Sequence, residues 1–399
     1  MATPPPSPPS PPPRPQPRPI EGDIPQTRWQ RIGGWVRTPM ARFGGAAGAG
    51  GLLLGLMIGL CAGGGETVAP VAGDTTVTTL PPILVDDDTT TTATTPDEVT
   101  VTTQPTLDRN PLTGEPLAAP TSRRIVAVKV DNVPAALPQI GIGDAEMIIE
   151  VPAEGGVTRF TAMFFETTPP TVGPVRSVRP VDADLLAPFH PVLMATGGRD
   201  FVLRLFEAAD IPVVGLDADG AYGLIDRPEP QHIVALLDLV ERFSGDEASP
   251  EGPFPFADEF PAEVAAASIS IPFSSVTDVV WRFEGGVWVR AQNGETSEWI
   301  AGPAGAPEPL TTDTVLVLSV AERSAGYVDL AGSDVPTYDV IGFGDAKVFH
   351  DGKVIEGRWL RAAQEDPWVL LDANGARMAL PVGRVFVEIV PRYVEVTFS

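Results

Sequence analysis

Alternating apolar and polar positions predict strands and short helices in the central part of the chain. Asp200 is a candidate N-cap for a helix that carries Phe201 and Leu205, and residues 231–243 place apolar side chains on one helical face. Strands and helices that interleave in this way predict a mixed, sandwich-like α/β first domain over residues 110–245. Five segments have the β-branched, alternating pattern of strands: residues 124–130, 146–151, 157–165, 192–196 and 211–216.

The pattern changes in the second half of the chain, where strands dominate. Residues 246–270 contain several prolines and predict a connection between domains. Further along, Asp351-Gly352 and Asn374-Gly375 are typical of hairpins, because both central positions of a type I′ turn need a positive φ. We therefore expect a smaller, mainly antiparallel, β-rich second domain over residues 271–399.

The first 109 residues have a different composition from the rest. Residues 1–43 are rich in proline and arginine, which predicts a disordered, polyproline-like tail. Residues 44–65 carry no charge and are long enough to cross a bilayer. Residues 66–109 are rich in threonine and acidic side chains and cannot bury enough apolar surface to fold, so they predict an extended linker.

Three interpretations of residues 44–65 compete. Four arginines lie close before the segment, at positions 28, 31, 37 and 42, which predicts a single-pass signal-anchor with the proline-rich tail in the cytoplasm. Alternatively, the segment is a lipoprotein signal that ends at Cys61, or a secretory signal that is cleaved. All three interpretations place the rest of the chain outside the cytoplasm. In the signal-anchor interpretation, residues 44–65 remain in contact with the membrane.

Charge and residue types exclude several classes of protein. The formal net charge of −25 opposes nucleic-acid binding, which depends on cationic groups that displace counterions from phosphates. One cysteine cannot form an intramolecular disulfide, and the three histidines are far apart in sequence, so we expect no metal site and no cofactor. Any anion that the chain binds needs a local cluster of arginines.

Five phrases of the sequence are distinctive: NPLTG at residues 110–114, VDN at 130–132, EVPAEGGVTRF at 150–160, GPVRSVRP at 173–180 and GFGDA at 342–346. They resemble the YerB-like family of exported bacterial proteins. The resemblance spans most of residues 110–399 and implies a membrane-attached bacterial protein or lipoprotein, with an α/β sandwich-like first domain and no assigned activity. It also implies that the folded C-terminal part lies outside the cytoplasm, at the cell membrane.

The densest polar cluster lies within these phrases and predicts an anion-binding site. Arginine guanidinium groups pair bidentately with carboxylate or phosphate, so three arginines can converge on one anionic ligand. Asp131 can orient them, and Ser177 is small enough to leave room for the ligand. The alternative is that the same residues form internal arginine–carboxylate pairs. The predicted ligand-binding arginines are Arg159, Arg176 and Arg179.

A second hypothesis is catalytic. Glu150 and Glu154 can form the acid and base of a glycosidase-like envelope hydrolase, and His232 is a further candidate base. The turn at residues 196–200 has the geometry of an anion site, but the carboxylate of Asp200 would compete for its backbone donors. We expect a non-enzymatic module that binds an anionic cell-wall or peptide ligand. The alternatives are the hydrolase and a scaffold for another envelope protein.

Overall fold

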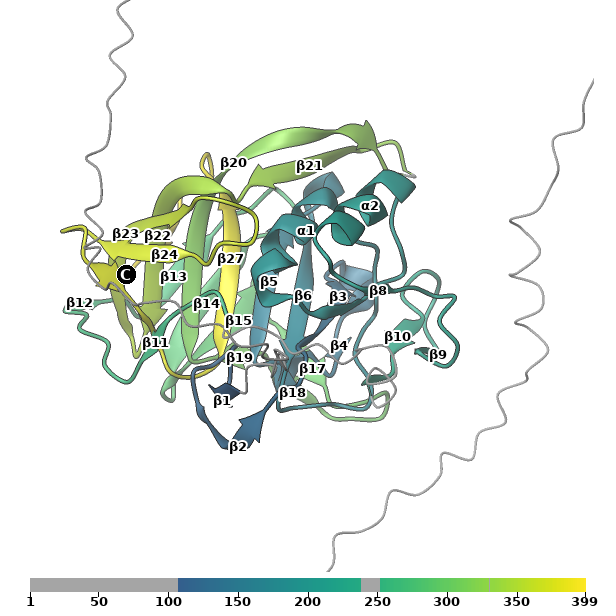
Figure 1. Ribbon diagram of the computed structural model, residues 1–399, viewed down its shortest axis with the longest axis horizontal. Helices are drawn as coiled ribbons and strands as arrows, with labels where there is room; N and C mark the ends of the chain where they lie inside the picture. The colour runs from purple at the N-terminus through teal and green to yellow at the C-terminus, as the bar shows by residue number, and fades with distance from the viewer. Residues whose placement is uncertain (1–106, 238–251, 330) are drawn as a thin grey trace, which may run out of the picture. The chain divides into compact units, whose positions relative to one another are not determined.

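The computed structural model describes residues 107–237, 252–329 and 331–399 (Figure 1). The predicted tail, the uncharged segment with Cys61 and nearly all of the threonine-rich linker lie outside these residues. Within the described ranges, no helix is long and apolar enough to cross a membrane. The anchor, lipidation and cleavage interpretations of residues 44–65 therefore stay predictions.

One large sheet runs through both halves of the folded part. Its order is β25-β24-β23-β22-β20-β27-β5-β6-β3-β7-β8, and β12 (Val264–Ala265) and β21 (Asp334–Asp339) pair with β23 and β20 beside this row. Strand β27 lies between β20 and β5 and is parallel to both, so it joins the two halves. The strands of the row are β3 (Val126–Asp131), β5 (Met147–Pro152), β6 (Thr158–Phe164), β7 (Val192–Met194), β8 (Val213–Val214), β20 (Thr314–Val328), β22 (Gly342–His350), β23 (Lys353–Arg361), β24 (Val369–Asp372), β25 (Arg377–Met378) and β27 (Val385–Pro391).

A second sheet packs against one face of the large sheet. Between the two sheets lies a core that includes Trp281, Trp288 and Phe386, and the rings of Trp281 and Phe386 meet edge to face at 4.8 Å. Burial of such large side chains is the main stabilising contribution to a layered fold. The second sheet consists of β13 (Ser268–Ile271), β14 (Val279–Glu284), β15 (Val287–Gln292), β16 (Glu295–Thr296), β19 (Thr311–Thr312) and β28 (Thr397–Phe398).

The opposite face of the large sheet is covered by two short helices. They are α1 (Pro180–Leu186) and α2 (Asp200–Ala208), and their buried side chains join the core formed by β5 and β6 on that face. The alternation along β5 explains the two layers, because Met147 and Ile149 face the helices while Ile148 faces the second sheet.

Short strands and 3₁₀ turns complete the described part. The pairs are β1 (Leu107–Arg109) with β2 (Pro116–Thr121), β9 (Tyr222–Leu224) with β10 (Ile233–Ala235), β11 (Phe256–Ala257) with β26 (Leu380–Pro381), and β17 (Glu298–Ile300) with both β4 (Gln139–Ile140) and β18 (Pro307–Pro309). The 3₁₀ turns are η2 (Pro134–Ala136), η3 (Ile142–Asp144), η4 (Glu154–Gly156) and η5 (Ala187–Phe189).

The predicted α/β fold class is wrong, because the described residues are mostly strand. They contain two α-helices, of seven and nine residues, which is too little for alternating strands and helices. The predicted helix over 231–243 is part of the error, since its described portion holds β10, which pairs antiparallel with β9. Helices cover one face of the large sheet, whereas an antiparallel sheet covers the other.

Candidate functional site

The predicted site residues gather at one edge of the large sheet. Strands β3, β5, β7 and β27 run in the same direction, so their carboxyl ends meet there. Asp131 ends β3, Glu154 follows β5 in η4, and the loop with Arg176 and Arg179 leads into α1. From Ala321 onward, β20 pairs with β21 and forms an arm that passes along α1 and η4 (Figure 1). The carboxyl edge of parallel strands is where ligands commonly bind in open sheets.

Two of the predicted arginines share one buried carboxylate. Nη2 of Arg159 donates to Oε1 of Glu154 at 2.6 Å, and Nε of Arg179 donates to Oε2 at 2.9 Å. Burial by itself would raise the pKa of Glu154, but the hydrogen bond from Arg179 and the positive charges of both arginines outweigh it and lower the pKa to about 2. Glu154 is therefore a carboxylate at neutral pH that holds η4 against the loop before α1.

The third predicted arginine also has an internal partner. Nε of Arg176 lies 2.8 Å from Oδ2 of Asp131 and forms an ion pair with it. Asp131 is fully buried, and the same oxygen accepts a hydrogen bond from Nε2 of Gln231 at 3.1 Å. The hydroxyls of Ser177 and Thr196 are 3.0 Å apart. The structure thus brings all five predicted ligand-binding residues to one edge, with each arginine paired to a carboxylate of the chain.

A buried lysine beneath this edge was missed by the sequence analysis. Nζ of Lys129 donates to Oδ1 of Asp182 at 2.7 Å and to the hydroxyl of Thr161 at 3.2 Å. Burial lowers the pKa of Lys129, and the negative charge of Asp182 opposes that effect. Oδ2 of Asp182 accepts the backbone N–H of Arg179 at 2.7 Å, at the start of α1. The available signal was a single charged residue inside the apolar run of β3.

Glu150 and Glu154, the predicted acid and base, have different surroundings. Glu154 binds arginines on the helix side of the sheet, whereas Glu150 is fully buried beneath the second sheet. Glu150 accepts hydrogen bonds from Nη2 of Arg290 at 2.8 Å and from the hydroxyl of Thr158 at 2.5 Å. His232, the other candidate base, is half-buried and lies 3.9 Å from the exposed carboxylate of Glu229.

A second buried carboxyl group lies beside Glu150. Glu388 pairs with Glu150 across β27 and β5, and it accepts the indole N–H of Trp281 at 2.8 Å. Burial and the nearby charge of Glu150 raise the pKa of Glu388 well above 4.5, and Arg290 opposes this only in part. Glu150, Glu388 and Arg290 therefore share one buried site. When one of the two carboxyl groups keeps its proton, the charges of the other carboxylate and the guanidinium cancel.

The substitution Glu388→Gln is expected to flatten the pH dependence of stability. Because the folded pKa of Glu388 is raised, the folded protein keeps a proton that the unfolded chain releases above its pKa of 4.5. Wild-type stability should therefore fall as the pH rises, by at most about 1.4 kcal/mol per pH unit from this group. Glutamine carries no titrating proton and keeps an acceptor for Trp281, so the variant loses this slope.

Urea unfolding between about pH 5 and pH 8 measures the slope for both proteins. The matched control is Glu356→Gln. The side chain of Glu356 is 55% exposed, so this substitution should leave the slope of stability against pH unchanged. Parallel pH profiles for the wild type and Glu388→Gln would contradict the prediction.

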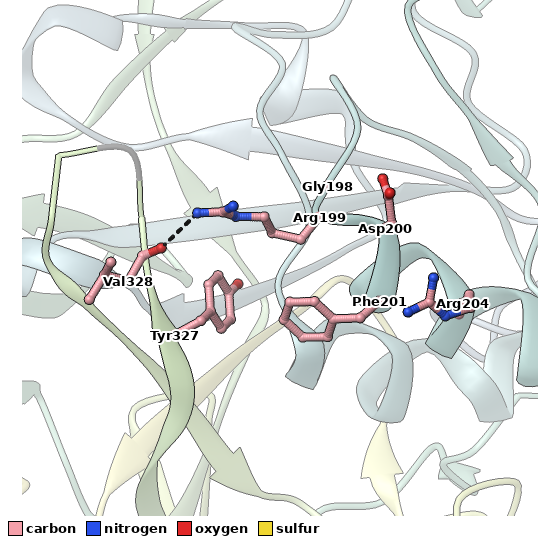
Figure 2. A pocket seen from close by; sticks show the side chains of 7 residues that line it. All are labelled: Gly198, Arg199, Asp200, Phe201, Arg204, Tyr327 and Val328. Atoms are coloured by element: carbon pink, nitrogen blue, oxygen red, sulfur yellow. Dashed lines mark hydrogen bonds between the residues drawn. The ribbon is translucent and has the colours of Figure 1, made fainter. Parts of the chain in front are cut away.

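A cleft opens between the start of α2 and the arm, and Figure 2 shows its lining. Its volume is about 730 Å³. The rings of Phe201 and Tyr327 meet edge to face at 5.0 Å across the cleft. Nη2 of Arg199 donates to the carbonyl oxygen of Val328 at 3.1 Å, which links α2 to the arm. The lining residues are Gly198, Arg199, Asp200, Phe201, Arg204, Tyr327 and Val328.

The cleft differs in its charges from the paired cluster, which consists of Arg159, Arg176, Arg179, Asp131 and Glu154. Within the described part of the chain, neither Arg199 nor Arg204 forms an ion pair with a carboxylate. The expectation that Asp200 caps α2 is wrong: Arg199 occupies the cap position, Asp200 is the first helical residue, and no side chain bonds the first turn. The sequence analysis considered the turn at residues 196–200 but missed the other wall of the cleft, because Tyr327 comes from a distant strand.

Comparison with known proteins identifies the family. Two family models match, described as the N-terminal domain of a protein of unknown function (DUF3048) over residues 112–233 and its C-terminal domain over residues 269–387. The protein named "Putative lipoprotein YerB" from Bacillus subtilis (strain 168) is 42% identical over 115 residues. That alignment covers 28% of this chain and 34% of the relative, so the chain matches about a third of the relative's length.

The fold is also that of a solved structure. The crystal structure of YerB protein from Bacillus subtilis superposes with a TM-score of 0.62 at 24% identity, and the match covers 72% of this chain and 99% of that one. The YerB-like resemblance that the sequence motifs predicted is confirmed by both comparisons. The chain therefore belongs to the DUF3048 family and is a homologue of YerB.

Proposed function

We propose that the protein is a membrane-attached, extracytoplasmic module that binds an anionic ligand of the bacterial cell envelope. The name of the relative, a lipoprotein, supports attachment to a membrane. The uncharged segment at residues 44–65 supports it independently, whether it acts as an anchor or as a lipidation signal. The proposed binding site is the cleft between α2 and the arm.

The observation that carries this proposal is the contrast between two groups of arginines. Arg159 and Arg179 share the carboxylate of Glu154, and Arg176 pairs with that of Asp131. Arg199 and Arg204, in contrast, line a cleft and form no ion pair with a carboxylate of the described residues. In a chain with a net charge of −25, a cleft in which two guanidinium groups outnumber the one carboxylate of Asp200 favours a negatively charged ligand.

The paired cluster can extend the site along the sheet edge. Tyr327 lines the cleft and also interacts with the paired cluster. Burial raises the pKa of Tyr327, and the positive charge of Arg179, in that cluster, partly opposes this rise. The side chains of Arg176 and Arg179 are 23% and 15% exposed, so both reach solvent while Arg159 lies beneath them. In this proposal Asp131 and Ser177 position the edge, and a ligand larger than the cleft would contact Arg176 and Arg179.

Sedimentation with isolated cell wall tests the proposal. The full-length protein in detergent should pellet with the wall, and the double variant Arg199→Gln/Arg204→Gln should bind at least about tenfold more weakly, because each charge-assisted hydrogen bond contributes about 1.5–3 kcal/mol. The matched control is Arg323→Gln on the same arm, whose guanidinium is paired to Asp339 and 62% exposed.

Three outcomes would overturn the proposal. Equal sedimentation of the double variant and the wild type would remove the cleft from the binding surface. Release of soluble wall fragments that is abolished by Glu150→Gln or Glu154→Gln would instead favour the hydrolase alternative. A partner protein captured by crosslinking, with no wall binding, would favour the scaffold alternative.

A further inference from the structure

The cleft contains three kinds of group that a simple anion would not use together. Arg199 and Arg204 supply positive charge, and the rings of Phe201 and Tyr327 supply an apolar wall. Asp200 adds an exposed carboxylate to the lining of the cleft. A carboxylate in an anion site costs affinity unless the ligand also donates hydrogen bonds to it.

We propose that the ligand is a sugar phosphate, an inference that rests on the anion-binding function proposed above. A phosphate ester carries up to two negative charges and a carboxylate carries one, so a phosphate matches the charge of a cleft with two guanidinium groups better. Sugar hydroxyls donate to the carboxylate of Asp200, which a bare phosphate group cannot do at neutral pH to the same extent.

The apolar wall formed by Phe201 and Tyr327 is the reason to expect a sugar ring in the ligand. Phe201 is 40% exposed and stands at 85° to Tyr327, so the pair leaves apolar ring surface open to the cleft (Figure 2). Val328, 48% exposed, continues this surface along the arm. The apolar C–H face of a pyranose can lie on such a wall while its phosphate reaches the arginines, and sites of this composition orient a ligand by a few polar groups on an apolar surface.

Calorimetric titration of the full-length protein in detergent tests the inference with four probes. They are N-acetylglucosamine 1-phosphate, glycerol 3-phosphate, N-acetylglucosamine and inorganic phosphate. We expect the sugar phosphate to bind about tenfold more tightly than glycerol 3-phosphate. Tyr327→Leu should remove most of that preference, whereas Arg204→Gln should weaken the binding of both esters. Phe343→Leu, at an aromatic residue that is 68% exposed elsewhere, is the matched control.

The outcomes separate the two proposals. Equal affinities for the two phosphate esters, both weakened by Arg204→Gln, would overturn the sugar phosphate and leave the anion-binding function standing. Absence of binding to any phosphate probe, with Arg204→Gln indistinguishable from the wild type, would overturn both. If the inference holds, sedimentation with phosphate-containing wall polymer, against flotation with vesicles that carry a lipid-linked sugar phosphate, distinguishes a wall source from a membrane source.

Discussion

Replacement of Arg290 by methionine is expected to destabilise the protein by about 3–5 kcal/mol, because it leaves buried carboxyl groups without their cation. Arg290 is 1% exposed, and its guanidinium donates to both oxygens of Glu150 beside Glu388. Urea unfolding at neutral pH measures the loss. Acidification should recover part of it, since protonation removes the uncompensated negative charge.

The surface pair on the arm provides the control for this loss. Arg323 and Asp339 are 62% and 41% exposed, and Arg323→Met should cost no more than about 1 kcal/mol. The double variant Arg290→Met/Glu150→Gln should be more stable than Arg290→Met alone, because it removes the orphaned charge together with its partner. If Arg290→Met lowered the free energy of unfolding as little as Arg323→Met does, the buried Arg290–Glu150 pair would not be what joins the two sheets.

Replacement of Asp182 by alanine is expected to have an effect of similar size, about 3–5 kcal/mol, since it leaves Lys129 buried with only a hydroxyl partner. It also removes the acceptor for the backbone N–H of Arg179 at the start of α1, which adds about 1 kcal/mol. Urea unfolding at neutral pH measures the sum.

The pH dependence of this variant has a definite sign. The folded pKa of Lys129 is lowered from 10.5, so the unfolded chain binds more protons and stability from this group rises as the pH increases toward 10.5. Removal of Asp182 should lower that pKa further and move the start of this rise to lower pH. Asp339→Ala is the matched surface control and should cost at most about 1 kcal/mol. Equal losses for the two aspartates would contradict the buried-pair assignment.

Local structure followed from the sequence wherever neighbouring residues determine it. The predicted strands at 146–151 and 157–165 are confirmed as β5 and β6, because their apolar runs satisfy a strand on both faces. The Asp351-Gly352 turn is confirmed between β22 and β23, with φ values of 47° and 66°. The prediction of a helix over residues 231–243 was wrong, because so short an apolar run fits a helix and a strand equally well.

Long-range structure did not follow from the sequence. An apolar strand does not reveal whether a helix or a second sheet covers it, so the fold class was wrong. Within the site, Glu154 and Arg159 are five residues apart and their proximity was predictable. Arg290 and Glu150 are 140 residues apart, and no local pattern connects them. Arg199 and Tyr327 are also far apart in sequence, and only the arm brings them together, so their proximity was missed.

The position of β27 in the large sheet affects how the protein is made. The ribosome synthesises β27 after every other strand of this sheet, yet it lies in the interior between β20 and β5. A nascent chain that ends before residue 385 therefore exposes the unpaired edges of two apolar strands. A premature stop codon between the end of β20 and the start of β27 would leave those edges open, so such truncated products should be substrates for chaperones and proteases.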